Sequence, residues 1–249
     1  MRNIAMKEKK ITLKIEGTKA KVVYHTFRGT KLNTLLVSFE EKRRVLSTLD
    51  GFRDVKYVAN AYIPYPVSEY AMNNYQEFEE TFPTLALGIP AAEITFLGTG
   101  VNMDNVAVCE ESYQEFTVCC LATAGVKGNA MRTGVDETNL VERNGKFEKT
   151  VGTINTLLLT NVPLSDGSLA RAIITATEAK TAALQDLNVR STYTPQNLAT
   201  GTGTDNIIVA SGKMVRKPLR ITGGHTKMSE LIGVSTKTAI TEAIKKRKY

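Results

Sequence analysis

Short runs of alternating apolar and polar residues dominate the first half of the chain and indicate β-strands. Gly17 marks the turn of a hairpin, and proline and glycine separate the later runs. The predicted strands lie at residues 11–16, 20–27, 34–39, 44–49, 94–98, 105–109 and 116–123. Residues 68–80, rich in Glu, Gln, Tyr and Met, predict a helix, and the polar residues 134–149 predict a loop or hairpin tip.

The second half of the chain alternates strands with longer helices. Its predicted elements are a strand at 153–160, a helix at 166–187, a strand at 207–209 and a helix at 227–247. Strands first, followed by strand–helix alternation, favour an α/β or α+β fold. We therefore predict a single mixed domain of three-layer type over residues 1–249, with helices packed on a large β-sheet.

The charge distribution changes this picture only at the two ends. The chain has 32 basic and 25 acidic residues, but most of the excess lies in the short basic ends, 1–10 and 245–249. The remainder is close to neutral, which argues against the broad basic face that a nucleic-acid partner requires. No apolar run reaches the ~18 residues of a membrane span and no signal peptide opens the chain, so we expect a cytoplasmic protein without a membrane partner.

Histidine and cysteine are too few and too poorly spaced to predict a metal site. The chain has two histidines and three cysteines, Cys109, Cys119 and Cys120, and no CxxC, HxH or HExxH spacing. We expect reduced thiols and no resident metal.

The helix at 166–187 carries the first candidate for chemistry. Its apolar face, read at 100° per residue, includes Lys180, whereas Glu178 falls on the opposite face. A lysine in an apolar stripe must reach water, pair with a carboxylate or lose its charge. It is therefore either a structural ion pair or an amine directed into a pocket.

A loop of alternating Gly and Thr precedes the strand at 207–209. Its residues are Thr200, Gly201, Thr202, Gly203 and Thr204. The loop lacks the lysine of a Walker loop and does not match GxGxxG. It is either a tight turn or a cradle whose backbone N–H groups hold an anion or a developing oxyanion.

Candidate bases and nucleophiles are scarce. His225 follows Gly223-Gly224 near the start of the last predicted helix, where the helix dipole favours a neutral imidazole. No Ser or Cys lies in a GxSxG turn. A Gly-Thr pair such as Gly152-Thr153 offers self-cleavage to an N-terminal nucleophile only as a minor alternative.

Several segments, in order and near their usual spacing, resemble the adenosylcobinamide amidohydrolase family of archaea and some bacteria. They are 152–157 (GTINTL), 164–170 (LSDGSLA), 175–184 (TATEAKTAAL), 199–205 (ATGTGTD) and 224–226 (GHT) in the second half, with 44–47 (RVLS), Gly51, Asn60, 122–125 (ATAG) and 128–130 (GNA) before them. The TEAK element together with the Gly/Thr/Asp loop is the specific part. Residues 50–54 (DGFRD) depart from the Gly-rich form typical of the family.

The resemblance implies a hydrolase of corrinoid salvage. The family cleaves the amide between the aminopropanol arm and the corrin propionyl side chain of adenosylcobinamide, giving adenosylcobyric acid and 1-amino-2-propanol. The implied partner is a small-molecule corrinoid, with homo-oligomers possible. No separate cofactor is implied, because cobalt enters with the substrate.

Because the sequence holds no clear nucleophile motif, we expect water to attack the amide directly. Glu178, Asp205 or His225 would be the base, and the N–H groups of residues 200–204, helped by Lys180, would hold the oxyanion. Asp205 is expected to pair with Lys180 if the loop packs over the helix.

The corrin itself suggests two further binding residues. Asn129 and Asn155 are expected to bind its peripheral amides. The alternatives are a corrinoid-binding module without hydrolysis and a nucleotide-binding protein that uses the loop 199–205.

Overall fold

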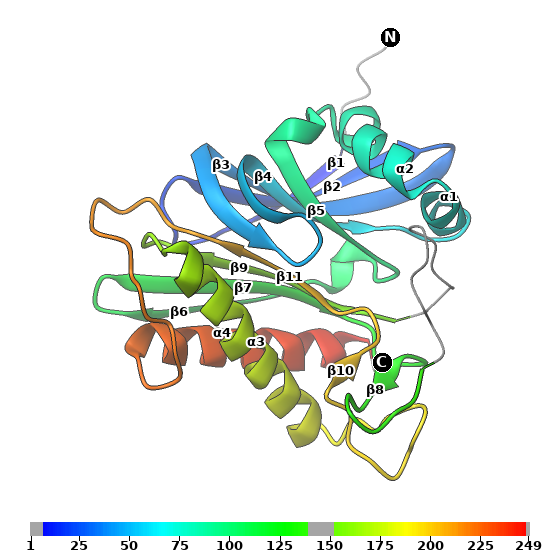
Figure 1. Cartoon of the computed structure of the whole chain (residues 1–249). Coiled ribbons are helices and arrows are strands. Elements are labelled where there is room, and N and C mark those ends of the chain that lie inside the picture. Colours follow the sequence, from blue (N-terminus) through cyan, green and yellow to red (C-terminus); the bar gives the residue numbers. More distant parts are fainter. Residues whose placement is uncertain (1–6, 139–151, 248–249) are drawn as a thin grey trace.

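A curled mixed sheet forms the centre of the computed structural model, which describes residues 7–138 and 152–247 (Figure 1). Within those ranges nine strands join in one sheet: β1 (Lys7–Ile11), β2 (Thr18–Phe27), β3 (Thr30–Ser47), β4 (Gly51–Tyr62), β5 (Ile94–Thr99), β6 (Ala107–Tyr113), β7 (Phe116–Ala124), β9 (Ile154–Thr160) and β11 (Asn206–Ala210). Their order is β1-β2-β3-β11-β9-β7-β6, with β4 on the other edge of β3 and β5 on β4. A two-stranded ribbon joins β8 (Ala130–Met131) to β10 (Gly201–Thr202).

The curl follows from the length of β3. The first part of this strand pairs with β2, and its last residues, Val45 to Ser47, pair with β11. A register shift between Ser38 and Arg43 lies between the two parts, and such bulges bend a strand and increase its twist. The two halves of the sheet therefore turn toward each other.

Helices cover both outer faces of the curled sheet. In Figure 1, α1 (Val67–Asn73) and α2 (Tyr75–Phe82) lie over β2 to β5, whereas α3 (Asp166–Asp186) and α4 (Lys227–Lys246) lie under β7, β9 and β11. Three apolar clusters match this arrangement. One lies between the sheet and α3 and α4, one lies between the sheet and α1 and α2, and one lies between the two halves of the sheet. The predicted large mixed sheet with packed helices is confirmed, and its curl gives four layers instead of the expected three.

Most elements of the second half lie where the sequence predicts them. The predicted strands at 153–160 and 207–209 are β9 and β11, and the predicted helices are α3 and α4. In the first half, β5 and β7 are also confirmed. The loop predicted at 134–149 lies mostly outside the described residues, since the description stops at residue 138.

The structure differs from the sequence predictions at five places in the first half. The first strand lies at Lys7–Ile11, not 11–16, because charged residues suit an exposed edge strand. The strands expected at 34–39 and 44–49 are one strand, β3, whose exposed residues 40–42 look like a loop in the sequence. The strand β4 was not predicted, the helix expected at 68–80 breaks at Asn74, and the strand expected at 105–109 begins at Ala107.

Candidate active site

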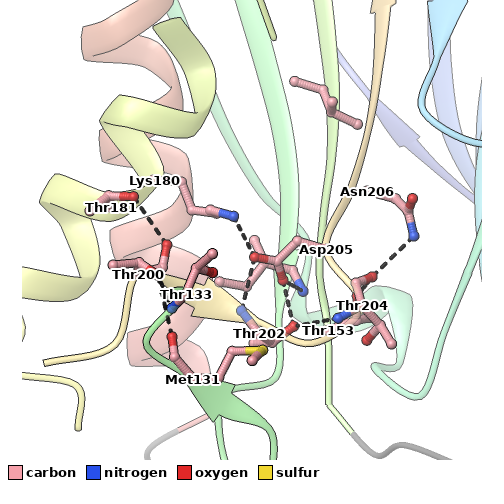
Figure 2. A network of polar contacts seen from close by, with 12 residues as sticks. Met131, Thr133, Thr153, Lys180, Thr181, Thr200, Thr202, Thr204, Asp205 and Asn206 are labelled. Carbon is pink, nitrogen blue, oxygen red and sulfur yellow. Dashed lines mark hydrogen bonds and ion pairs between the residues drawn. The ribbon is translucent and has the colours of Figure 1, made fainter. Parts of the chain in front are cut away.

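An ion pair between α3 and the Gly/Thr loop forms the centre of the site. Lys180 Nζ lies 2.5 Å from Asp205 Oδ2, and the two side chains are only 15% and 13% exposed (Figure 2). Lys180 reaches this position because it shares the inner side of α3 with buried residues such as Ala176 and Leu184. The expected pairing is confirmed, and both of its side chains are mostly buried.

The carboxylate of Asp205 is fully engaged by donors. Its Oδ2 accepts from Lys180 Nζ and from the N–H of Thr202 at 2.9 Å. Its Oδ1 accepts from Thr202 Oγ1 at 2.5 Å and from the N–H of Ile154 at 2.9 Å. A carboxylate offers about four acceptor positions. Asp205 therefore holds the loop and the start of β9 together, and this geometry leaves it no lone pair with which to act as the expected base.

Glycine is required at position 201 by the ion pair. A Cβ there would lie 2.5 Å from Asp205 Oδ2 and 2.8 Å from Lys180 Nζ. The loop is closed on its other side by Thr200, whose N–H donates to Met131 O at 2.9 Å and whose carbonyl accepts from Thr181 Oγ1 at 3.0 Å (Figure 2). The alternation of Gly and Thr thus has a packing cause.

Three of the five N–H groups expected to hold an oxyanion are bonded inside the protein. Those of Thr200, Thr202 and Gly203 donate to Met131 O, Asp205 Oδ2 and Asn129 O, respectively. Backbone donors already bonded inside the protein are not free to stabilise a substrate, so these three groups do not add to a cradle for developing charge.

Side chains provide such a cradle at the start of β9. The carbonyl oxygen of Gly152 accepts from Asn129 Nδ2 at 2.7 Å and from Thr204 Oγ1 at 2.8 Å. The hydroxyl of Thr153, the next residue, donates to Thr204 O at 2.6 Å. In the sequence this Gly-Thr pair offers self-cleavage only as a minor alternative, because its signal is no more than its position at the start of a predicted strand.

Comparison with known proteins identifies the family. A family model described as adenosylcobinamide amidohydrolase matches residues 17–249. The chain belongs to the adenosylcobinamide amidohydrolase family. Family membership indicates a hydrolase that acts on an amide.

Two relatives match the chain over different lengths. An uncharacterized protein of Methanocaldococcus jannaschii is 43% identical over 94% of this chain and 96% of its own length. The adenosylcobinamide amidohydrolase of Methanosarcina mazei is 34% identical over 49% of this chain and 48% of its own length.

Solved structures of similar shape are more distant. The PH0078 protein of Pyrococcus horikoshii has a TM-score of 0.45 at 10% identity, covering 93% of this chain and 85% of that one. An L-aminopeptidase D-Ala-esterase/amidase of Ochrobactrum anthropi, described as a variant of the Ntn hydrolase fold, has a TM-score of 0.44 at 10% identity with the same coverage. Both scores are below 0.5, so neither likeness carries an argument about mechanism.

The two asparagines expected to bind the corrin are buried in this family member. Asn155 is 0% exposed, and its Nδ2 donates to Asn60 Oδ1 and to Gly98 O, both at 2.9 Å. It ties β9 to β4 and β5 between the two halves of the sheet and cannot reach a substrate. Asn129 is 1% exposed and bonds inside the protein, so its contact is with the Gly152 carbonyl.

A network of hydroxyl and carboxylate groups fixes the segment that carries Asn129. Asp136 accepts from the N–H of Arg132 at 2.5 Å, from Ser191 Oγ at 2.6 Å and from Thr194 Oγ1. Partial desolvation acts to raise the pKa of Asp136, but these hydrogen bonds outweigh it and hold the pKa below its usual value. Tyr193 OH donates to Asn129 Oδ1 at 3.3 Å and orients the amide.

Glu178 and His225 lie away from the ion pair. Glu178 is exposed on the outer side of α3. His225 is exposed in the turn before α4, where Gly223 lies against the guanidinium of Arg171. Arg171 is nine residues before Lys180 on α3, or roughly 13 Å along the helix at 1.5 Å per residue. The structure therefore brings neither expected base to the Lys180–Asp205 pair.

The hollows near the site are small. A pocket of about 90 Å³ lies between α3 and the sheet and is lined by Lys180, Asp205, Ile154 and their neighbours. A larger hollow of about 830 Å³ lies elsewhere, among charged residues such as Lys14, Glu40 and Lys213. In the described part of the chain, no group of three or more His, Cys, Asp or Glu side chains is arranged to hold a metal ion. Among its helices, none has the length and apolar character of a membrane span.

Proposed function

We propose that this protein hydrolyses the amide that joins the aminopropanol arm of adenosylcobinamide to the corrin propionyl side chain. The products are adenosylcobyric acid and 1-amino-2-propanol. The observation that carries the proposal is the meeting of the family's specific residues at one place. Lys180 of the TEAK element and Asp205 of the Gly/Thr loop bond to each other, and Asp205 also bonds to the first residue of β9.

The small size of the pocket favours a binding mode in which only part of the substrate enters it. A pocket of about 90 Å³ is well below the roughly 300–1,000 Å³ that is usual for small-molecule sites. It is large enough for a short arm and far too small for a corrin ring. We therefore place the ring at the surface, with only the aminopropanol arm directed toward the start of β9.

Lys180 and Asp205 act in this proposal as positioning residues. Asp205 bonds to Thr202 and Ile154, and so sets the distance between the loop and β9. Lys180 neutralises the buried carboxylate. Charge that develops on the amide oxygen needs donors aimed at it, and Asn129 Nδ2 and Thr204 Oγ1 already converge on one carbonyl oxygen beside this pair. Cobalt enters with the substrate, and the chain's own residues carry out the hydrolysis.

The test is incubation of the purified protein with adenosylcobinamide, with and without EDTA, followed by separation of corrinoids and mass analysis. We expect adenosylcobyric acid and aminopropanol in equal amounts, in both arms. Corrinoid that binds stoichiometrically but releases no amine would overturn the proposal and favour a binding module. Loss of turnover with EDTA would overturn its metal-free part.

A matched pair of variants tests the role of the ion pair. Lys180→Met removes the charge that neutralises Asp205, so turnover should fall by about 100-fold, as for loss of one electrostatic group in a site. Lys31→Met, at an exposed lysine of β3, should leave turnover unchanged. Normal turnover and normal stability of Lys180→Met would refute the positioning role of Lys180.

A further inference from the structure

The Gly152–Thr153 peptide bond is held as a reacting acyl group is held. Its carbonyl oxygen accepts from two side-chain donors, Asn129 Nδ2 at 2.7 Å and Thr204 Oγ1 at 2.8 Å. Hydrogen-bond donors that converge on the oxygen of an acyl group are the kind of arrangement that stabilises the oxyanion formed during acyl transfer. Neither donor comes from a neighbouring part of the sequence, since Asn129 and Thr204 lie 23 and 52 residues from Gly152.

A hydroxyl suited to attack this carbonyl lies on the next residue. Thr153 Oγ1 belongs to the same peptide unit, so its reaction with the Gly152 carbonyl carbon is intramolecular and needs no binding step. Thr153 is only 6% exposed, and its hydroxyl donates to Thr204 O at 2.6 Å. The hydroxyl is therefore held in place and largely shielded from water.

The backbone of Gly152 is specialised in the same way. Its φ of +107° lies in a region that L side chains rarely adopt. A Cβ at this position would lie 2.7 Å from Gly125 O and 3.1 Å from Asn129 Cβ. Glycine thus allows the close approach that brings the Asn129 amide to the carbonyl oxygen.

We propose that the protein cleaves its own chain between Gly152 and Thr153 and so makes Thr153 an N-terminal nucleophile. Thr153 Oγ1 attacks the Gly152 carbonyl carbon, and the negative charge on the oxygen is held by Asn129 and Thr204. The C–N bond breaks, and the proton from the hydroxyl goes to the nitrogen of Thr153. Water then hydrolyses the resulting ester and leaves a Gly152 carboxylate, the Thr153 hydroxyl and a free α-amine.

The mature residue has the two groups that an activated nucleophile needs. The α-amine of Thr153 takes the proton of its own hydroxyl, and Oγ1 attacks the substrate carbonyl. The amine of the substrate leaves with a proton, and water hydrolyses the acyl ester to release the acid. This second part rests on the proposed amide hydrolysis, whereas the self-cleavage does not. Asp205 holds the adjacent residue through the Ile154 N–H and so fixes the start of β9 for both reactions.

The test is the intact mass of the full chain after expression in a cell-free system, followed over time without substrate. We expect the 27.3 kDa chain to give two fragments whose masses sum to the chain plus one water, at a rate independent of protein concentration. N-terminal sequencing of the smaller fragment should begin at Thr153. A wild-type protein that stays at the full mass would overturn the proposal.

Variants separate self-cleavage from proteolysis and from misfolding. Thr153→Val, which is nearly isosteric, should stay intact, and Thr153→Ser should still be cleaved. Asn129→Ala keeps the nucleophile and loses one oxyanion donor, so cleavage should slow about 100-fold. Thr30→Ala alters the same Gly-Thr dipeptide at the start of β3, after the exposed turn residue Gly29, and should be cleaved like the wild type. Fragments of the same mass from Thr153→Val would overturn the proposal.

Activity distinguishes the two proposals from each other. A cleaved protein that releases no aminopropanol would overturn the proposed substrate and leave the self-cleavage standing. An intact protein with full turnover would overturn the self-cleavage and leave the proposed function standing.

Discussion

Replacing Asp205 by alanine should lower the free energy of unfolding far more than the same change at Asp186, which pairs with Lys237. Asp205→Ala leaves the Lys180 ammonium, in a side chain only 15% exposed, without its carboxylate. Removal of one partner from a buried pair costs about 3–5 kcal/mol. Three other donors, the N–H and Oγ1 of Thr202 and the N–H of Ile154, lose their acceptor as well. Water entering the vacated space offsets part of that loss, so we expect a total of about 4 kcal/mol.

The control is Asp186→Ala. Asp186 lies 2.6 Å from Lys237, a distance close to that of the first pair, but the two side chains are 60% and 45% exposed. An exposed pair contributes about 0–1 kcal/mol. The same chemical change at similar distance should therefore differ by about 3 kcal/mol, because Asp205 is buried and accepts three further hydrogen bonds.

Urea unfolding at neutral pH, monitored by circular dichroism, measures both variants. In a separate thermal scan, a loss of about 4 kcal/mol should lower the melting temperature of a chain of this size by roughly 10 °C. The double variant Asp205→Ala/Lys180→Met should recover part of the loss, because no charge is then left unpaired. Asp205→Ala within 1 kcal/mol of Asp186→Ala would refute the claim that burial makes this pair special.

Two further predictions concern packing and pH. Gly201→Ala places a Cβ 2.5 Å from Asp205 Oδ2 and should abolish turnover. At Gly224 a Cβ meets nothing within 4 Å, so Gly224→Ala should leave turnover unchanged. Equal turnover of the two variants would contradict the packing argument. Burial lowers the pKa of His25 from 6.5 to about 4, so the unfolded state binds more protons and stability falls as pH drops from about 6.5 to about 4. The loss approaches about 3 kcal/mol at 1.36 kcal/mol per pKa unit. In urea titrations across this range, His25→Gln should flatten the dependence and His225→Gln, at an exposed site, should not.

Local periodicity in the sequence predicts the helices of the second half well. The predicted helix at 166–187 matches α3 to within one residue, and Lys180 shares the inner side of α3 with buried apolar residues, as expected. These features follow from side chains a few residues apart. The Lys180–Asp205 pair could also be predicted, because the Gly/Thr loop follows α3 directly in the chain.

Predictions that depend on distant segments were less successful. Asn155 looked available for a substrate, but β9 is covered on one face by helices and on the other by the opposite half of the sheet. Alternation along a strand does not show which polar side chains such a fold buries. The meaning of Gly152-Thr153 depends on donors 23 and 52 residues away, which no local pattern reveals.

The most direct test of amide hydrolysis is the destination of the water oxygen. Turnover of adenosylcobinamide in heavy-oxygen water should place one labelled oxygen in the new carboxylate of adenosylcobyric acid and none in 1-amino-2-propanol, as read by mass spectrometry of both products. Label in the aminopropanol, or adenosylcobinamide recovered unchanged, would contradict acyl cleavage by this protein.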